Sequence, residues 1–222
     1  MITVHHLNNS RSQRVLWLLE ELELPYEIVR YERQPDMLAP PSLRAVHPLG
    51  KSPVITDDGR TVAESGAILE YLVERYGMGR LCPERGTEER LRFSYWMHYA
   101  EGSLMPLLVM KLVFGQIPRG PMPFIVRPVA RGISDKVQSV FLQPQLVRHF
   151  AYLEAELGKS SWFAGEAFTA ADIQMSFPLE AMSVRGGGDR AKYPRIHTFL
   201  DRIHARPAYQ RALTKGGPFE VL

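Results

Sequence analysis

The first 31 residues change their hydrophobic period twice, and this alternation restricts the folds open to the chain. Residues 2–6 alternate in the manner of a short strand, whereas residues 15–22 carry apolar side chains at helical spacing. Leu24-Pro25 ends that helix, and residues 26–31 again have strand character. A strand, a helix and a second strand in this order predict a parallel pair joined by a right-handed crossover.

Residues 53–63 contain a strong hairpin signal. Asp58-Gly59 separates two short apolar runs, and a helix is expected over residues 64–76 directly afterwards. The proline-rich stretch 35–48 that precedes the hairpin is expected to be a loop. The order βαβ, loop, ββα predicts a four-stranded mixed sheet with helices packed against it.

No convincing strand follows residue 78, and the pattern becomes helical throughout. Helices are expected over residues 87–114, within 122–157, from a capping box at Thr169 and Asp172 onward, and over 193–213. The fold class that we predict is therefore α/β followed by all-α. The predicted parts are an α/β domain at residues 1–78, a linker at 79–86 and an all-helical domain at 87–222.

Composition excludes several classes of protein. Cys82 is the only cysteine, which rules out an intrachain disulfide and a cysteine metal cluster and favours a reducing, cytoplasmic location. The sequence shows no secretory signal and no apolar run near the roughly 20 residues of a membrane span, so no membrane partner is expected. The net charge of +3 includes no dense basic cluster interleaved with aromatic residues, which argues against nucleic-acid binding.

Two short features beside the hairpin are candidates for a ligand site. Pro53 begins a strand, where its missing amide donor does least harm, and by itself it is compatible with an ordinary trans proline. Glu64 and Ser65 begin the next helix. Ser65 either caps the helix or joins the free amides in binding an anion, and Glu64 either complements the helix dipole or binds a cation. The residues alone leave these alternatives open.

The turn before the first helix, "NNSRSQR", offers another candidate. Ser10 and Gln13 match a capping box, in which the Ser10 hydroxyl would accept a hydrogen bond from the Gln13 amide. A hydroxyl can accept one hydrogen bond and donate another. A capping role therefore does not exclude a role of Ser10 in chemistry.

Three segments in this order resemble the glutathione S-transferase family: "HLNNSRSQRVLWLLEELELPYEIV", "HPLGKSPVITDDGRTVAESGAILEYL" and "WFAGEAFTAADIQMSFPL". The resemblance covers essentially the whole chain, and "PMPFIVRPVARGI" is similar to a bacterial and fungal, theta-like branch. It implies a thioredoxin-like first domain, a helical second domain and a homodimer. Glutathione would be a co-substrate, with no metal and no tightly bound cofactor.

The resemblance also implies roles for the residues around the hairpin. Ser52-Pro53 would be cis, and the backbone of Val54 would pair with the cysteinyl part of glutathione. Glu64 would bind the γ-glutamyl ammonium group, and Ser65 with the helix amides would bind the neighbouring carboxylate. This family pattern favours ligand binding over simple helix capping.

Ser10 matches the catalytic-serine position of the theta-like and zeta-like classes, four residues before Arg14. Its hydroxyl would donate to the thiolate of glutathione, with Asn9 and Arg11 as neighbours able to share the role. Lys51 stands where the family often has glutamine and is expected to pair with the glycyl carboxylate. The turn contains no tyrosine and no cysteine, so the tyrosine-type and mixed-disulfide mechanisms are not expected.

The second substrate is expected to be a small hydrophobic electrophile, bound between the domains beside Tyr99 and Met105. Some classes use an acid from the partner subunit, but the corresponding positions here are Met105 or Pro106, with Glu101 one turn earlier. The predicted activity is conjugation of glutathione to such electrophiles, as in detoxification. Glutathione-dependent peroxidase, isomerase or dehalogenase chemistry and a non-catalytic binding module are the alternatives.

Overall fold

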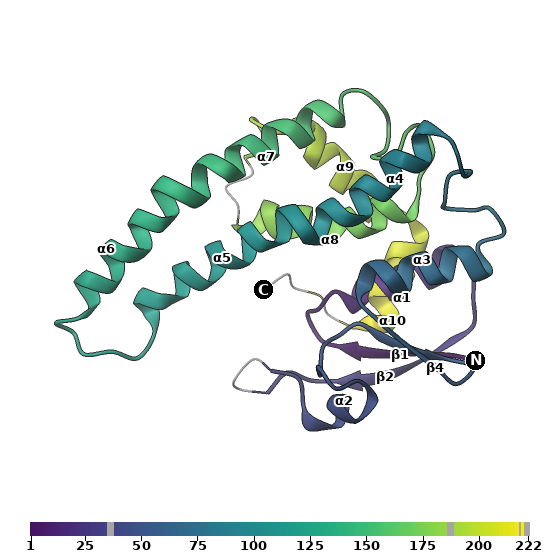
Figure 1. The fold of residues 1–222 in the computed structure, drawn as a ribbon, viewed down its shortest axis with the longest axis horizontal. Coiled ribbons are helices and arrows are strands. Elements are labelled where there is room, and N and C mark those ends of the chain that lie inside the picture. Colours follow the sequence, from purple (N-terminus) through teal and green to yellow (C-terminus); the bar gives the residue numbers. More distant parts are fainter. Residues whose placement is uncertain (35–37, 186–188, 218, 220–222) are drawn as a thin grey trace.

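A mixed β-sheet is followed by a long helical region in the structure, which is a computed structural model (Figure 1). It describes residues 1–34, 38–185, 189–217 and 219. The elements of the first region are β1 (Ile2–Leu7), α1 (Ser12–Glu21), β2 (Tyr26–Tyr31), α2 (Pro41–Val46), β3 (Val54–Asp57), β4 (Arg60–Ala63) and α3 (Ser65–Tyr76).

The sheet has the strand order β2-β1-β3-β4. β1 pairs with β2 in parallel, with Ile2 opposite Tyr26, and β3 pairs antiparallel with both β1 and β4. The predicted fold class is confirmed, including the parallel crossover pair and the Asp58-Gly59 hairpin.

The two faces of the sheet are covered by different helices. Val4 of β1 points into the main core beside α1 and α3, whereas Leu7, at an odd spacing from it, points to the opposite face. There Leu7 packs with Leu43 of α2. The expectation of a loop throughout residues 35–48 is therefore wrong in part, because Pro40 and Pro41 provide a favourable start for the short helix α2.

The helical region contains two long helical stretches that lie side by side (Figure 1). Their outer part, residues 109–141, projects from the body and is called the arm. Its elements are α4 (Glu88–Tyr99), the π-helical turn η1 (Ala100–Leu104), α5 (Met105–Gln116), the 3-10 turn η2 (Ile117–Arg119), α6 (Arg127–Val137), the π-helical turn η3 (Gln138–Leu142), α7 (Gln143–Glu156), α8 (Ala170–Arg185), α9 (Pro194–His204) and α10 (Pro207–Gly216).

The single helix expected over residues 193–213 is instead two helices, α9 and α10. Pro207 disfavours a helical conformation of the residue before it, and Arg206 is extended with φ −69° and ψ 130°. The predicted capping box at the start of α8 is present in one direction, since the Asp172 carboxylate accepts from the Thr169 amide at 2.8 Å. The Thr169 hydroxyl accepts from the Ala171 amide rather than from that of Asp172.

Helix α10 returns to pack on α1, and a buried carboxylate joins them. Glu20 accepts hydrogen bonds from Tyr26 at 2.7 Å, Arg211 at 2.8 Å and Lys215 at 2.5 Å. Burial alone would raise the pKa of Glu20, but these hydrogen bonds outweigh burial and hold it below its usual value of 4.5. The ionised carboxylate therefore helps to dock the C-terminal helix on the first domain.

We predict that Glu20→Gln lowers the free energy of unfolding at neutral pH by about 1–3 kcal/mol, because it weakens hydrogen bonds to two cations. A carboxylate with a lowered pKa contributes stability above pH 4.5, and this contribution is lost as the pH falls through the folded-state value. Urea unfolding above and below pH 4.5 should therefore show the difference from the unaltered protein shrinking on acidification. The exposed Glu23→Gln is the control, and a pH-independent difference would contradict the prediction.

Candidate functional site

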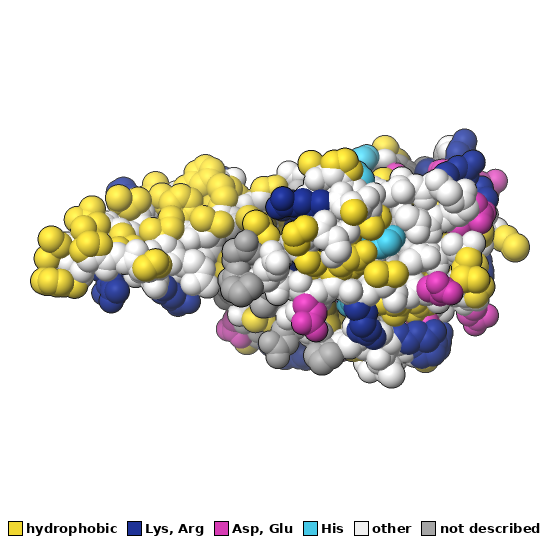
Figure 2. All heavy atoms as spheres, turned by 90° about the horizontal axis from the view of Figure 1, so that it is seen from below, with side chains coloured by type: hydrophobic (Ala, Val, Ile, Leu, Met, Phe, Trp, Pro, Cys, Tyr) yellow, Lys and Arg dark blue, Asp and Glu magenta, His cyan; other side chains and the backbone are white. Residues whose placement is uncertain are grey.

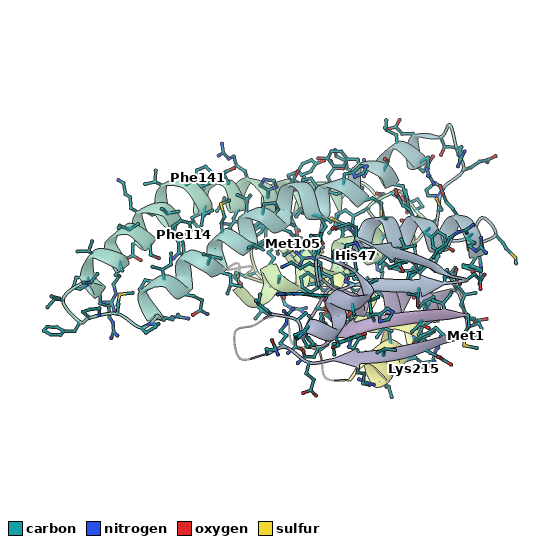
Figure 3. All side chains as sticks on the ribbon, turned by 60° about the horizontal axis from the view of Figure 1, so that its bottom comes forward. Met1, His47, Met105, Phe114, Phe141 and Lys215 are labelled. Carbon is teal, nitrogen blue, oxygen red and sulfur yellow. The ribbon has the colours of Figure 1, made fainter. Side chains whose placement is uncertain are left out.

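A cavity of about 310 Å³ opens where the turn before β3, the start of α3 and the turn η1 meet. His47 and Glu101 line it, and Figure 3 shows His47 on the first-domain side of this junction. The cavity also brings together six of the eight residues predicted to bind glutathione, namely Arg11, Lys51, Ser52, Pro53, Glu64 and Ser65.

The turn before β3 has the backbone geometry that the family resemblance implies. The Ser52-Pro53 peptide bond is cis. The Ser52 hydroxyl donates to the His5 carbonyl at 3.1 Å and accepts from the Leu7 amide at 3.3 Å, which fixes the turn to the end of β1. Val54 follows as a buried residue of β3, and its predicted backbone role stays a prediction.

The start of α3 is arranged as an anion site. Glu64 has φ 72° and ψ 122°, a left-handed conformation that is uncommon for a residue with a side chain and typical of functional sites. No side chain caps this helix, and its first intrahelical bond runs from the Ile68 amide to the Glu64 carbonyl. The amides of Ser65 and Gly66 therefore have no partner within the helix and can bind a carboxylate.

Arg14 connects this helix start to the second domain. Its side chain is 2 % exposed and donates to the Gln174 carbonyl at 2.6 Å, the Gln174 side chain at 3.0 Å, the Ser65 hydroxyl at 3.2 Å and Glu101 at 2.5 Å. Because Ser65 accepts from Arg14, its own proton remains available to an anion in the cavity. The sequence pattern gave Arg14 no ligand role and did not predict Gln174, because neither residue lies in the local ligand motifs.

Glu101 supplies a second carboxylate to the same cavity. It accepts from Arg11 Nε with both oxygens, at 2.9 and 3.0 Å, in addition to Arg14. Burial would raise the pKa of Glu101, but the two guanidinium groups outweigh it and lower the pKa below its usual value. A π-helical turn carries this residue, as is frequent at functional sites. Glu64 and Glu101 give the cavity negative charge beside the anion site at Ser65.

A second cavity of about 250 Å³ adjoins the first, and both are lined by Arg11, Leu49, Lys51 and Ser52. Four cationic side chains line it, those of Arg11, Arg33, Arg44 and Lys51, with no acidic residue among its described lining. Gly50 makes room for one of them, because a Cβ at this residue, with φ +55°, would lie 2.7 Å from Arg44 Cγ. Phe177, from α8, adds an aromatic wall.

Ser10 lines this second cavity and is bonded to the protein on several sides. Its hydroxyl donates to the Leu7 carbonyl at 2.7 Å, lies 2.8 Å from the Ser12 hydroxyl and accepts from the Ser12 amide at 3.3 Å. The hydroxyl bond to the Gln13 amide, expected of a capping box, is absent among the described contacts, and the Gln13 side-chain amide has no partner there.

His6 extends this chain of hydrogen bonds behind Ser10. Its Nδ1 lies 2.8 Å from the Ser12 hydroxyl, and its ring also bonds to the backbone of Gly216. Burial, with the charge of Arg30, lowers the pKa of His6 to about 4, so the ring is neutral at pH 7. A neutral ring that donates to the Gly216 carbonyl accepts at Nδ1, and Ser12 therefore donates to His6.

The remaining predicted site residues lie outside both cavities. Tyr99 is buried, with its hydroxyl 2.5 Å from His149 Nδ1, and burial raises its pKa. Met105 is buried at the base of the arm, where Figure 3 labels it. Asn9, which has φ 48°, contributes its carbonyl to Arg33 rather than a side chain to the lining. Phe177, which the sequence analysis missed, is the aromatic residue beside Ser10.

Comparison with known proteins agrees with this geometry. Residues 10–75 match the family described as the glutathione S-transferase N-terminal domain, and residues 125–207 match the C-terminal domain. The chain is 40% identical to glutathione S-transferase 3 of Schizosaccharomyces pombe over 97% of this chain and 88% of that protein. It is 28% identical to disulfide-bond oxidoreductase YfcG of Escherichia coli over 97% of this chain and 95% of that protein.

A solved structure extends the similarity to three dimensions. A glutathione S-transferase from Actinobacillus pleuropneumoniae superposes with a TM-score of 0.79 at 31% identity, covering 100% of this chain and 95% of that one. The likeness therefore includes both the sheet and the helical region.

We predict that Arg14→Lys destabilises the fold by about 2–3 kcal/mol and weakens glutathione binding about tenfold. Lysine keeps the charge but lacks the planar fork, so buried acceptors around it lose their donor and Ser65 loses its orientation. Urea unfolding and calorimetric titration with glutathione measure the two effects. The control is Arg75→Lys on the outer side of α3, for which we expect no measurable change. Unchanged affinity in a stable Arg14→Lys variant would contradict the prediction.

Proposed function

The chain belongs to the glutathione S-transferase family, and we propose that it binds glutathione in the 310 Å³ cavity and adds the thiolate to a small apolar electrophile beside Ser10. One observation carries this proposal: the cavity holds an anion site at Ser65 next to the carboxylates of Glu64 and Glu101. The γ-glutamyl end of glutathione has a carboxylate and an ammonium group on the same carbon, and it matches this pair of charges.

The residues of the cavity wall support a position for the rest of the tripeptide. With the γ-glutamyl end at Ser65, the cysteinyl backbone lies along Val54 and the cis turn, as the family resemblance implies. The glycyl carboxylate reaches the exposed Lys51, which lines both cavities. The sulfur then faces the second cavity, where Ser10 and Phe177 lie.

Thiol activation is the chemical task of the site. A free thiol has a pKa of about 8.5, and lowering it by about two units requires about 2.7 kcal/mol of preferential stabilisation of the thiolate. Arg11 contributes positive charge beside the cavity, and the start of α1 has neither a capping side chain nor an acid in its first turn. A hydroxyl donated by Ser10 adds a charge-assisted hydrogen bond.

To donate a hydrogen bond to the thiolate, the Ser10 hydroxyl must turn its hydrogen away from its present acceptor. That proton is directed to the Leu7 carbonyl at 2.7 Å, with the Ser12 oxygen as the other acceptor at 2.8 Å. The Ser12 hydroxyl lies 3.3 Å from the same Leu7 carbonyl and can replace Ser10 there once its proton turns away from His6 Nδ1. The exchange is a rotation of two hydroxyl groups and needs no movement of the backbone.

The electrophile is proposed to bind in the second cavity, beside Phe177 and Leu49. Tyr99 and Met105 are not part of the proposed electrophile site, because both are buried and neither lines either cavity. In the reaction a carbon–sulfur bond forms. With a halide substrate the carbon–halogen bond breaks and its electron pair leaves with the halide. With an activated alkene the π electron pair moves to the neighbouring carbon, which then takes a proton from water.

We predict that glutathione bound to the protein has a thiol pKa about two units below the free value, read from its ultraviolet thiolate absorbance against pH. Ser10→Ala should return the pKa most of the way to about 8.5, because the hydroxyl donor is lost. Ser12→Ala leaves the Ser10 hydroxyl in place but removes the group that replaces it at the Leu7 carbonyl, so the thiol pKa should rise by less than it does in Ser10→Ala. Binding without any shift would refute the conjugating function. A shift that survives Ser10→Ala would reassign activation to Asn9, Arg11 or the helix amides.

A second candidate function is thiol–disulfide exchange, favoured by the four cations that line the second cavity. A glutathionyl disulfide would bring further carboxylates to these cations. Cys82 is the only cysteine of the chain and lines neither cavity, so the attacking thiolate is that of bound glutathione. This thiolate attacks the glutathionyl sulfur of the mixed disulfide and displaces the thiolate of its other half, so that glutathione disulfide forms and the electrons balance. The similar protein named disulfide-bond oxidoreductase supports testing this reaction.

We predict that Arg44→Gln raises the KM for a glutathionylated peptide disulfide about fivefold and leaves the KM for an uncharged aromatic halide unchanged. Removing one cation weakens the binding of the anionic disulfide substrate and does not affect the binding of the uncharged halide. Steady-state assays of both reactions, with Arg60→Gln on β4 as the control, separate the candidates. Equal effects on both substrates would count against the disulfide function. A hydroperoxide assay in parallel tests the peroxidase alternative.

We further propose a homodimer in a reducing, cytoplasmic compartment, with detoxification as its role. The support is the family resemblance and a third hollow, between α3 and the stretch formed by α4 and η1, where Gly66, Ala67 and Gly102 leave room for close approach of another chain. Sedimentation at several concentrations measures the assembly, and a strictly monomeric protein would exclude it.

A further inference from the structure

The arm (residues 109–141) exposes a large share of the apolar side chains on the surface of the protein. Nineteen large hydrophobic side chains are exposed in the described part of the chain, and ten of them belong to the arm: Val109, Val113, Ile117, Phe124, Ile125, Val126, Val129, Ile133, Val140 and Phe141. Figure 2 shows hydrophobic side chains along much of one face of the arm. Contiguous apolar surface of this kind marks a binding surface for a protein or a membrane.

The exposure follows helical periodicity on both helices. Val109 and Val113 of α5 and Ile117 of the following turn η2 recur every four residues, and Val129 and Ile133 of α6 have the same spacing. The two helices are joined by a hydrogen bond from the Ser134 hydroxyl to the Phe114 carbonyl at 2.7 Å. Figure 3 labels Phe114 of α5 and Phe141 of η3, which belong to the two neighbouring helical stretches. The exposed stripes therefore belong to a folded surface.

The end of the arm is its most apolar part. The turn between α5 and α6 lies farthest from the body in Figure 1, and it carries Phe124 and Ile125 at 83% and 69% exposure. A protruding apolar tip suits a fluid layer that can close around it, as the boundary between lipid headgroups and acyl chains does.

Cations surround this tip. The arm contains five Lys and Arg and one acid, Asp135. Arg119, Arg127, Arg131 and Lys136 are exposed, and no ion pair to a described residue is found for any of the four. Long basic side chains around an apolar tip can bury their stems and hold their charges at lipid headgroups.

We propose that the tip of the arm inserts into the surface of an anionic lipid bilayer and attaches the protein to it peripherally. Phe124 and Ile125 would enter the headgroup boundary, and the four basic residues would contact anionic headgroups. This proposal departs from the expectation of no membrane partner, which rested on the absence of a long apolar run.

The attachment is peripheral and not spanning. The stretch Glu88–Arg119 is long and apolar enough to cross a membrane by length and composition. However, it contains Glu101, which is ion-paired with Arg11 and Arg14 inside the cleft, and Trp96, which is buried in the core. Withdrawing this stretch into lipid would dismantle the site. The tip can enter the interface with the fold unchanged.

Vesicle co-sedimentation tests the proposal without reference to catalysis. We expect binding to vesicles of phosphatidylcholine with phosphatidylserine, much weaker binding to phosphatidylcholine alone, and a decline with added salt. Phe124→Asp should lower the partition coefficient at least tenfold, and Arg127→Gln about fivefold, because an apolar anchor and one cation are lost. Leu91→Asp, an equally polar change at an exposed residue of α4, is the control and should bind as the unaltered protein does.

A fluorescent probe gives an independent readout. In the variant Phe124→Trp, the emission of the new tryptophan should shift to shorter wavelength with anionic vesicles and should be quenched by brominated acyl chains. The tryptophan of the control variant Leu91→Trp should show neither change. Absence of vesicle binding, or equal binding of the Phe124→Asp and Leu91→Asp variants, would overturn the proposal. So would a change of oligomeric state on Phe124→Asp in the absence of lipid, which would assign the tip to a second copy of the chain.

Discussion

The buried guanidinium of Arg14 is the interaction on which the site depends. It lies in α1, yet its acceptors come from α3, from η1 and from α8, so one side chain joins the first domain to two helices of the second. Burying an unpaired charge at this depth would cost more free energy than the net stability of a folded domain. The elements that carry the acceptors must therefore pack around Arg14. The walls of the ligand cavity are therefore positioned by one cation, together with Glu101 as its counter-ion.

The two adjoining cavities divide the chemistry between them. The first offers both signs of charge, with the free amides at Ser65 and the carboxylates of Glu64 and Glu101, which suits a zwitterion. The second is positive and aromatic, which favours an ionised thiol and leaves a contact surface for its reaction partner. Ser52 lies in the wall of both and is 3.4 Å from Ser10, so the turn proposed to bind the peptide is connected to the group proposed to activate the sulfur.

Local periodicity and turn motifs in the sequence predicted the sheet and its order of elements. The cis bond at Ser52-Pro53 and the ligand roles of Glu64 and Ser65 came from the family resemblance, because the residues alone left the alternatives open. Gln174 and Phe177 were missed because they reach the site from 160 or more residues beyond Arg14, through packing that no local pattern records. Helical spacing placed Tyr99 on a helix, but spacing does not say which side of a helix faces the cleft. Tyr99 faces the aromatic side chains of α7 instead.

The arm and the site share one continuous helical stretch, since α5 follows directly from the turn that carries Glu101. A tip held at a lipid surface would therefore hold the cleft at a fixed distance from it, with no flexible linker between them. Apolar electrophiles concentrate in bilayers for the same reason that apolar side chains leave water. An enzyme attached by a tip so far from its ion-paired core can meet such substrates where they accumulate. The polar network that its chemistry needs remains in water.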